Sequence, residues 1–335
     1  MKIHEKYIKR CIELAKNGLG TTYPNPLVGS VIVYENKIIG EGWHKKSGEP
    51  HAEVNAVNSV KDKSLLKKAT IYVSLEPCSH FGKTPPCCDL IIENQIPNVV
   101  IGTVDPNIEV AGKGIKKLIE AGKNVTVGIL EEECNELNKR FFTFHKTKRP
   151  YIILKWAESQ DGYISPISKK EKKPIWITNE FSRQLVHKWR TEEQSIFVGT
   201  QTVIDDNPKL NVRDWTGENP IRIVLDQNNR IPKECHIFDN QSKTIVLSSP
   251  EIDFSKNIAA QIAHILFKKN IQSVIIEGGR QTIQTFIDAS LWDEARIFRG
   301  QLFLEKGTDA PALKSGWEEK KFILDDELLI FRNYD

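Results

Sequence analysis

The chain has 335 residues, enough for two domains or one large one, and 39% of them are hydrophobic and 27% charged. This composition excludes a disordered, collagen-like or low-complexity chain. Lys and Arg total 47 against 44 Asp and Glu, a balance that argues against a dedicated nucleic-acid binder. No apolar run approaches the roughly 20 residues that cross a bilayer, and no apolar signal segment follows Met1. We therefore expect a cytoplasmic protein with no membrane partner.

The first half of the chain alternates helical and strand patterns. Apolar residues at helical spacing over 3–17 predict a helix that ends at Gly18, and the run 28–34 predicts a buried strand. Pro50 suits the start of a helix over 51–60. The later patterns predict, in order, a strand at 71–75, a helix from Cys88, a strand at 99–101, a helix at 113–121, a strand at 125–127 and a helix at 131–145. This alternation is typical of an α/β domain whose helices cover a central sheet.

A charged stretch at 146–150 precedes a second α/β pattern. We place a domain boundary there and expect domains at 1–146 and 147–335. The second pattern predicts a helix over about 179–190 and strands at 151–154, 195–198, 221–225, 244–247 and 273–276.

The six cysteines do not form the dense pattern of a disulfide scaffold. Cys11, Cys134 and Cys235 are expected to be small buried hydrophobes. Cys78 and Cys87 differ, because they follow a histidine and a glutamate in an order that suits metal chemistry.

That order begins with His51-Ala52-Glu53 at the start of a predicted helix, and Pro77-Cys78 follows the next strand, nine positions before Cys87. One His and two Cys supply three zinc ligands and leave a fourth tetrahedral position for water, as in a catalytic site. Zinc lowers the pKa of that water, and Glu53 is placed to carry its proton to the substrate. The order of these residues is the signature of zinc nucleobase deaminases.

Two neighbouring residues compete for these roles. His80 replaces His51 as a ligand only if the predicted helix frame is wrong. Cys88 could replace Cys87, and the local residues do not decide between them. The alternative without a metal is that the same motif consists of a surface His, a Glu near a helix start and two buried thiols.

The segment Pro77–Cys87 (PCSHFGKTPPC), with Asn25–Gly29 (NPLVG) upstream, resembles the deaminase half of the bifunctional riboflavin-biosynthesis deaminase–reductase family. The long spacing between its cysteines is specific to that family. The resemblance implies a cytidine-deaminase-like α/β/α domain in which His51, Cys78 and Cys87 bind Zn²⁺ and Glu53 moves protons. By analogy alone it favours Cys87 over Cys88.

The family acts on a phosphoribosylated diaminopyrimidine, so the resemblance implies a small phosphorylated pyrimidine as the substrate. A phosphate needs cationic or amide donors near the mouth of the site. The residues proposed to contact the substrate are Asn25, His44, Lys83 and Asn107. Each is also acceptable as an ordinary turn residue, since Asp105-Pro106-Asn107 is good turn chemistry.

Residues 150 onward lack the G-x-G-x-x-G fingerprint of an ordinary dinucleotide fold. Instead, the predicted strand at 273–276 runs into Glu277-Gly278-Gly279-Arg280 at the start of a helix. Glycines at such a turn let the backbone approach a phosphate, which the helix N-terminus also favours. A Gly-Gly turn on its own is common, so its neighbours must support the interpretation.

The surrounding blocks resemble the reductase half of the same family; they are 149–162, 176–178, 186–190, 198–213 and 220–226. The resemblance implies a dihydrofolate-reductase-like α/β domain that uses NADPH, and a homo-oligomeric assembly. Gln160 and Pro174 depart from the residues common in the family, and no residue stands out as the proton donor of the reduction.

Substrate contacts in this half are assigned to Arg190, Leu210, Arg213 and Glu277, the arginines being fork donors for phosphate or carbonyl oxygens. The cofactor contacts that match the family are Ala157, Trp176, Thr202, Asp206, Gly279, Arg280, Gln281, Thr282, Ile283, Gln284 and Thr285.

We therefore expect a two-domain enzyme of riboflavin biosynthesis. Its first domain would deaminate 2,5-diamino-6-(5-phosphoribosylamino)pyrimidin-4(3H)-one, and its second would reduce the ribosyl chain of the resulting 5-amino-6-(5-phosphoribosylamino)uracil to ribityl. One alternative, a tRNA or nucleoside deaminase with an accessory domain, predicts a short cysteine spacing and an RNA-binding face. The other, a zinc-stabilised binding module, predicts a fourth protein ligand and no acid beside the metal.

Overall fold

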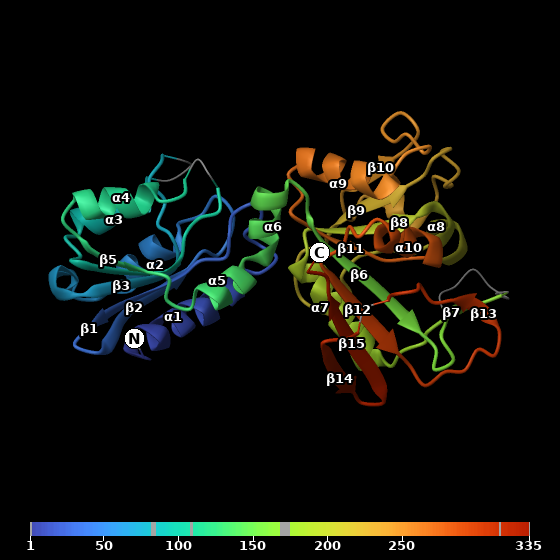
Figure 1. Cartoon of the computed structure of the whole chain (residues 1–335), viewed down its shortest axis with the longest axis horizontal. Helices are drawn as coiled ribbons and strands as arrows, with labels where there is room; N and C mark the ends of the chain where they lie inside the picture. Colours follow the sequence, from blue (N-terminus) through green and yellow to red (C-terminus); the bar gives the residue numbers. More distant parts are fainter. Residues whose placement is uncertain (1, 82–84, 108–109, 168–174, 315, 335) are drawn as a thin grey trace. The chain divides into compact units, whose positions relative to one another are not determined.

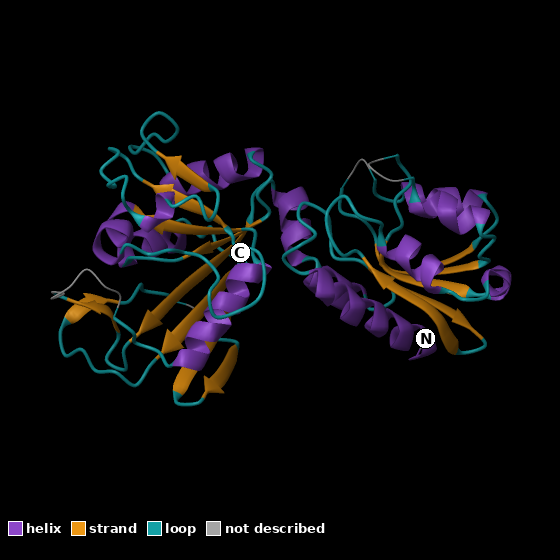
Figure 2. Cartoon of the chain, turned by 180° about the vertical axis from the view of Figure 1, so that it is seen from behind, coloured by secondary structure: helices purple, strands orange, loops and turns teal. Residues whose placement is uncertain are grey.

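A computed structural model of the chain describes residues 2–81, 85–107, 110–167, 175–314 and 316–334. The chain divides into two compact units, Met1–Thr147 and Lys148–Asp335. Each unit has its own central sheet with helices packed against it (Figures 1 and 2). Within the described residues, no helix combines the length and the apolar character that crossing a membrane requires.

Unit 1 is a three-layer α/β/α domain. Its elements are α1 (Lys2–Ala15), η1 (Lys16–Gly18), β1 (Gly29–Tyr34), β2 (Lys37–Trp43), α2 (Ala52–Ser59), η2 (Lys63–Lys68), β3 (Thr70–Leu75), α3 (Cys87–Glu93), β4 (Asn98–Thr103), α4 (Lys113–Glu120), β5 (Asn124–Val127), α5 (Glu131–Leu137) and α6 (Lys139–Thr147). The strand order is β2-β1-β3-β4-β5, antiparallel at β2/β1 and β1/β3 and parallel from β3 to β5.

Two apolar layers hold this sheet in place. Helices α1 and α5 pack on one face through residues such as Tyr7 and Cys134, and α2, α3 and α4 cover the other through Ala56, Ile91 and Leu118. Because both faces are covered, β1 and β3 are buried along almost their whole length. The parallel strands β3 and β4 therefore deliver the loops that follow them to one edge of the sheet.

The single helix expected over 131–145 is two helices, α5 and α6. Asn138 lies in the break between them and is buried. Its Oδ1 atom accepts from the backbone N–H of Leu27 at 2.8 Å, and its Nδ2 atom donates to the Leu27 carbonyl oxygen at 2.9 Å. These contacts satisfy a polar side chain in the interior and explain why the helix ends there.

Unit 2 is built on a mostly parallel sheet. Its elements are β6 (Tyr151–Glu158), β7 (Tyr163–Pro166), α7 (Glu180–Glu192), β8 (Ser195–Gly199), α8 (Thr200–Asp206), β9 (Ile221–Leu225), η3 (His236–Phe238), β10 (Thr244–Leu247), α9 (Ile258–Lys268), β11 (Ser273–Ile276), α10 (Arg280–Asp288), β12 (Glu294–Arg299), β13 (Gly307–Asp309), β14 (Glu319–Ile323) and β15 (Asp326–Arg332). The strand order is β10-β9-β8-β11-β6-β12-β15-β14, and β13 pairs with β7 in a separate ribbon.

The strands from β10 to β12 are parallel, whereas β15 and β14 are antiparallel to their neighbours. Helices α9 and α10 pack on one face through residues such as Ile262 and Phe286, and α7 packs on the other through Val186 and Trp189. The carboxyl ends of β8, β11 and β6 consequently lie side by side, which is where open α/β sheets bind ligands.

Candidate functional site

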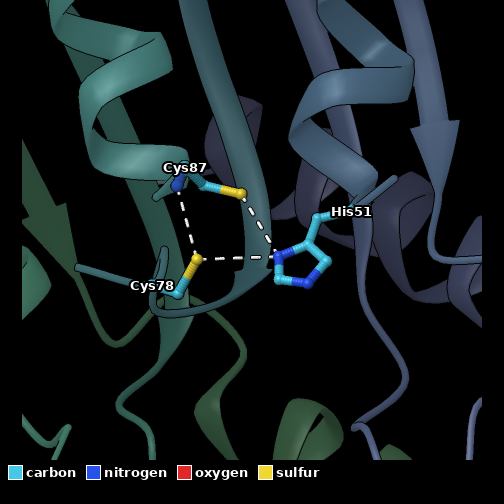
Figure 3. A group of neighbouring side chains, drawn as sticks. All are labelled: His51, Cys78 and Cys87. Atoms are coloured by element: carbon cyan, nitrogen blue, oxygen red, sulfur yellow. Dashed lines mark hydrogen bonds between the residues drawn. The ribbon is translucent and has the colours of Figure 1, made fainter. Parts of the chain in front are cut away.

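Three metal-ligating groups converge in unit 1 (Figure 3). His51 is the N-cap residue of α2, Cys78 follows the end of β3, and Cys87 is the first residue of α3. The Nδ1 atom of His51 lies 3.6 Å from Sγ of Cys78 and 3.4 Å from Sγ of Cys87. Elements that are distant in the sequence thus bring three ligand atoms within 4.8 Å of one another.

These distances suit a tetrahedral zinc ion. Bonds of about 2.0 Å to nitrogen and about 2.3 Å to sulfur place the two ligand atoms about 3.5 Å apart at the tetrahedral angle. The backbone N–H of Cys87 also donates to Sγ of Cys78 at 3.3 Å. The hydrogen bond with the Cys87 side chain, followed by that with His51, lowers the pKa of Cys78 and favours its thiolate, whereas the same hydrogen bond raises the pKa of Cys87. Among the described residues the group contains no fourth ligand.

The two competing residues lie elsewhere. Sγ of Cys88 points to the carbonyl oxygens of Pro77 and Gly114, at 3.3 and 3.6 Å. His80 is exposed and is not part of the converging group. The geometry therefore brings His51 and Cys87, and not His80 or Cys88, into the converging group.

Glu53, expected from the sequence to move protons, lies beside the converging ligands. It lies in the first turn of α2, is buried, and interacts with the Cys87 side chain. Burial raises the pKa of Glu53 to about 7, and the negative charge of Cys78 adds to the shift. A carboxyl group in such surroundings can both accept and donate a proton near neutral pH.

Asn25 and His44 form a pair beside the metal ligands. The His44 ring is buried and lies edge-on to that of His51, with 5.3 Å between the ring centroids. Its Nδ1 atom donates to the Pro50 carbonyl oxygen at 3.3 Å, so Nε2 accepts from Nδ2 of Asn25 at 3.0 Å. Burial lowers the pKa of His44, in agreement with a neutral ring. The pair sets the orientation of the Asn25 amide.

Asn107 lies in the loop between β4 and α4, at the same edge of the sheet as Cys78. Its backbone N–H donates to Oδ1 of Asp105 at 2.8 Å, and its carbonyl oxygen accepts from the N–H groups of Val110 and Ala111. Lys83, the remaining residue expected to contact the substrate here, lies outside the described residues.

A second group of charged side chains lies mostly buried in unit 2, where β11 ends beside the middle of β6. Glu277 directly follows β11, and its Oε2 atom accepts from Nη2 of Arg190 on α7 at 3.0 Å. Its Oε1 atom lies 3.7 Å from Nζ of Lys155 on β6. Within the described residues, Oε1 of Glu277 and Nε of Arg190 are buried and have no hydrogen-bond partner.

Their surroundings move the pKa values in a way that suits proton transfer. Burial alone would raise the pKa of Glu277, but the positive charges of Lys155 and Arg190 lower it. Burial lowers the pKa of Lys155. The group therefore combines an ionised carboxylate with a lysine that releases its proton more readily than usual.

Sequence reasoning did not select Lys155. In a strand pattern a lysine looks like a residue that faces solvent, although Leu154 and Trp156 on either side are buried in the core. The signal that could have identified it is a charged residue in the middle of a strand whose two faces are both covered.

Arg213 lies next to this group, and Leu210 does not point towards it. Nη1 of Arg213 donates to Oδ1 of Asn211 at 2.7 Å, and Nη1 of Arg190 donates to the Asn211 carbonyl oxygen at 3.2 Å. The backbone N–H of Arg213 donates to Nδ1 of His187 at 3.0 Å. Leu210 is buried in the apolar core under α7, so a contact with a ligand would use its backbone.

The expected cofactor turn is formed where α8 and α10 begin. The backbone N–H of Gly279 donates to Oγ1 of Thr202 at 3.0 Å, so the first turns of the two helices lie side by side. Gly278 has a φ of 121°, and a Cβ at this position would lie 2.9 Å from Oγ1 of Thr202. The two glycines thus let the turn pack closely against the Thr202 side chain where two helix starts meet, and such helix starts fit the phosphates of a dinucleotide.

Several of the other expected cofactor residues belong to α10. Arg280 pairs with Asp309 at 2.9 Å. Ile283 is buried in the core, Oε1 of Gln284 accepts from the N–H of Ala312, and Oγ1 of Thr285 donates to the Gln281 carbonyl oxygen. These last side chains are engaged away from the turn.

The remaining expected cofactor residues come from several elements. Ala157 is on β6, Thr282 is in the first turn of α10 and Asp206 ends α8. Trp176 is exposed and stacks with Arg183.

Known proteins match both halves of the chain. Residues 150–314 match the RibD C-terminal domain, and residues 1–103 match the cytidine and deoxycytidylate deaminase zinc-binding region. The riboflavin biosynthesis protein RibD of Aquifex aeolicus is 39% identical over 322 residues, which is 91% of this chain and 89% of that protein.

Two solved structures are similar over 99% of this chain and of their own. One is a diaminohydroxyphosphoribosylaminopyrimidine deaminase/5-amino-6-(5-phosphoribosylamino)uracil reductase from Thermotoga maritima, with a TM-score of 0.89 and 37% identity. The other is RibD from Acinetobacter baumannii, with a TM-score of 0.88 and 32% identity.

Proposed function

Because the chain belongs to the family of the riboflavin biosynthesis protein RibD, we propose that its two halves perform consecutive steps on one pyrimidine. The chain is a bifunctional enzyme of riboflavin biosynthesis with a zinc-dependent deaminase domain and an NADPH-dependent reductase domain. The expected fold class is confirmed: a cytidine-deaminase-like domain precedes a dihydrofolate-reductase-like one. We assign the deaminase to residues 1–146 and the reductase to 147–335.

The proposed substrate of the deaminase is 2,5-diamino-6-(5-phosphoribosylamino)pyrimidin-4(3H)-one. The substrate follows from the family, and the observation that carries the deaminase chemistry is the convergence of His51, Cys78 and Cys87 with the buried Glu53. When bound, zinc activates water for attack on the pyrimidine and NADPH supplies hydride in the second step. Glu53 accepts the proton of the attacking water and returns it to the departing amine.

Substrate binding in this half is assigned to three polar side chains and Lys83. His44 orients Asn25 towards the pyrimidine, and Asn107 lies at the same edge of the sheet as Cys78. Lys83 belongs to the same segment as the two cysteines and supplies a cation for the phosphate.

The proposed substrate of the reductase is 5-amino-6-(5-phosphoribosylamino)uracil. Reduction to the ribityl chain adds hydride to C1′ and a proton to the ring oxygen that leaves it. Lys155, held by Glu277, is the proposed proton source, because its side chain is only 16% exposed and its pKa is lowered. Arg190 and Arg213 bind the substrate with Glu277, and the turn at Gly279 holds the cofactor phosphates.

The competing interpretations are less consistent with the chain. A tRNA or nucleoside deaminase is not favoured, because the second half matches the RibD C-terminal domain. A zinc-stabilised binding module needs a fourth protein ligand, and the described residues bring only three together.

The proposed assembly is a homo-oligomer in the cytoplasm that binds neither nucleic acid nor membranes. The nearly even balance of 47 basic and 44 acidic residues supports the absence of a nucleic-acid partner, since it provides little excess charge for a polyanion. Light scattering coupled to size-exclusion chromatography tests the oligomeric state, and a monomer would contradict it.

A coupled assay tests the proposed order of the two steps. The zinc-loaded enzyme is given the diaminopyrimidine and NADPH, and ammonia and NADPH absorbance are followed together. We expect ammonia release first and cofactor oxidation after it. Absence of both signals from folded, metal-loaded protein would contradict the proposal, and ammonia without oxidation would contradict the second step.

A further inference from the structure

Glu76 is a buried carboxylate that the mechanism above does not use. It follows the end of β3 and directly precedes Pro77 and the zinc ligand Cys78. Its side chain is 5% exposed, and its own backbone N–H donates to the carbonyl oxygen of Thr103 at the end of β4 at 2.9 Å. A carboxylate this deeply buried requires compensating hydrogen bonds.

Four backbone amides provide that compensation. Oε1 of Glu76 accepts from the N–H groups of Gly114 at 2.9 Å and Ile115 at 3.2 Å. Oε2 accepts from those of Gly112 at 3.0 Å and Asp105 at 3.3 Å. The donors therefore include both ends of the loop between β4 and α4 and the first turn of α4, whose dipole also favours a negative charge.

The same segment packs tightly against α4. A Cβ on Gly114 would lie 2.1 Å from the carbonyl oxygen of Pro77, so only glycine allows this approach. Sγ of Cys88 donates to the same oxygen, and the N–H of Cys88 donates to the carbonyl oxygen of Cys78 at 3.1 Å. The backbone that carries Cys78 is thus fixed between α3 and α4.

The loop that Glu76 holds is the one that carries Asn107. One of its four donors, Asp105 N–H, is two residues from Asn107, and Oδ1 of Asp105 in turn accepts from the Asn107 N–H. A single carboxylate therefore connects the segment of the metal ligand with the loop proposed to bind the substrate.

We infer that Glu76 is a positioning residue of the deaminase, which sets the position of the Asn107 loop relative to the segment that carries Cys78. The inference rests on the proposed function of unit 1. Glu76 touches neither the metal ligands' donor atoms nor the substrate in this role, and it acts through the loop. Its loss should therefore weaken substrate binding more than the chemical step.

The test is Glu76→Gln in the full-length enzyme. The variant keeps the shape but replaces one acceptor oxygen by an NH₂ group that faces amide donors. We expect KM for the diaminopyrimidine to rise about tenfold or more, with kcat changed less than threefold and the zinc content unchanged, as for a displaced binding loop. Glu120→Gln, the same substitution at an exposed position of α4, should leave both constants within twofold.

A double-mutant cycle separates positioning from general support of the fold. If Glu76 acts through the loop, Glu76→Gln should add little to the effect of Asn107→Ala on KM, because the second change removes what the first displaces. Additive effects would overturn the inference, as would a folded, zinc-containing Glu76→Gln enzyme with unchanged KM or one in which only kcat falls.

A second variant covers the case in which Glu76→Gln does not fold. Gly112→Ala keeps Glu76 but strains one of its four donors, since Gly112 has a φ of 75° with no atom near an added Cβ. It should raise KM in the same direction with zinc retained, and an unchanged KM would overturn the inference. Failure of the proposed function would appear already in the wild-type enzyme, whereas failure of this inference appears only between variants.

Discussion

Glu53 and Glu277 are buried carboxyl groups at the two proposed reaction sites, and their surroundings move their pKa values in opposite directions. Burial and the charge of Cys78 raise that of Glu53 to about 7. At Glu277, the positive charges of Lys155 and Arg190 outweigh burial and lower it. The first group is suited to accept and return a proton, whereas the second stays ionised and holds its lysine in place.

Glu53→Gln should abolish deamination without loss of the metal. The amide has the same shape but cannot accept the proton of the attacking water, so we expect ammonia release to fall by about 10²- to 10⁴-fold. The measurement is ammonia release at saturating diaminopyrimidine, with zinc content determined by atomic absorption. Retained activity would show that another group carries the proton.

The same variant provides an internal control. Supplied with 5-amino-6-(5-phosphoribosylamino)uracil, it should oxidise NADPH at the wild-type rate, because Glu53 and the proposed reductase site belong to different units. Glu49→Gln, an exposed substitution in the same region, should leave both activities unchanged.

The lowered pKa of His187 should make the free energy of unfolding of unit 2 smaller in acid. Its Nδ1 atom accepts from the N–H of Arg213, and burial, with the charges of Arg190 and Arg213, lowers its pKa to about 4. Between about pH 6.5 and pH 4 the unfolded chain binds a proton here that the folded chain does not. The free energy of unfolding should therefore fall as the pH falls through this range. The slope should correspond to at most one additional proton bound by the unfolded chain.

Urea unfolding followed by tryptophan fluorescence measures this dependence, since Trp43 is the one tryptophan of unit 1 and the signal reports mainly on unit 2. His187→Asn should flatten the dependence between these pH values. His264→Asn, at an exposed position of α9, should leave it as in the wild type. An equal slope in all three proteins would exclude His187 as the source.

At the level of elements, the turn between β11 and α10 determines how closely a phosphate can approach. Gly278 has a φ of 121°, and a Cβ added at this position would lie 2.9 Å from Oγ1 of Thr202. Gly278→Ala should therefore displace the turn and raise the KM for NADPH by about tenfold or more, with deamination unchanged.

A neighbouring glycine provides the comparison. Gly279 has a φ of −71°, and its added Cβ would lie 3.7 Å from the same oxygen, which is ordinary contact. Gly279→Ala should therefore raise the KM for NADPH less than Gly278→Ala does. Equal effects of the two alanines would mean that the turn is not limited by backbone conformation.

The elements that the sequence patterns missed show where local patterns stop being informative. β12 lies in the interior of its sheet, between β6 and β15, yet Glu294 and Arg296 interrupt its apolar run. In the fold these charges are buried together, with Nε of Arg296 donating to Oε1 of Glu294 at 2.6 Å. A pairing of this kind depends on tertiary structure, as does the break at Asn138, whose partner Leu27 is distant in the sequence.

At the scale of the whole molecule, the two sites differ in how far the sequence could predict them. The order His51, Cys78, Cys87 could be found from the sequence, because each ligand stands at the start or end of a recognisable element and zinc restricts the residue types. The group of Lys155, Arg190 and Glu277 comes from β6, α7 and the end of β11. The strand order β11-β6 brings Glu277 beside Lys155, the packing of α7 adds Arg190, and no local pattern encodes either arrangement.

The division into two units predicts that zinc removal affects one activity only. The proposed zinc ligands lie in unit 1 and the Lys155–Glu277 pair lies in unit 2. Chelation should therefore stop ammonia release from the diaminopyrimidine, and with it the NADPH oxidation that depends on the deaminated product. The same protein given 5-amino-6-(5-phosphoribosylamino)uracil should oxidise NADPH at an unchanged rate, and zinc should restore the first activity. If chelation also slowed reduction of the uracil, the reductase would depend on metal in unit 1, and the two sites could not be treated as separate.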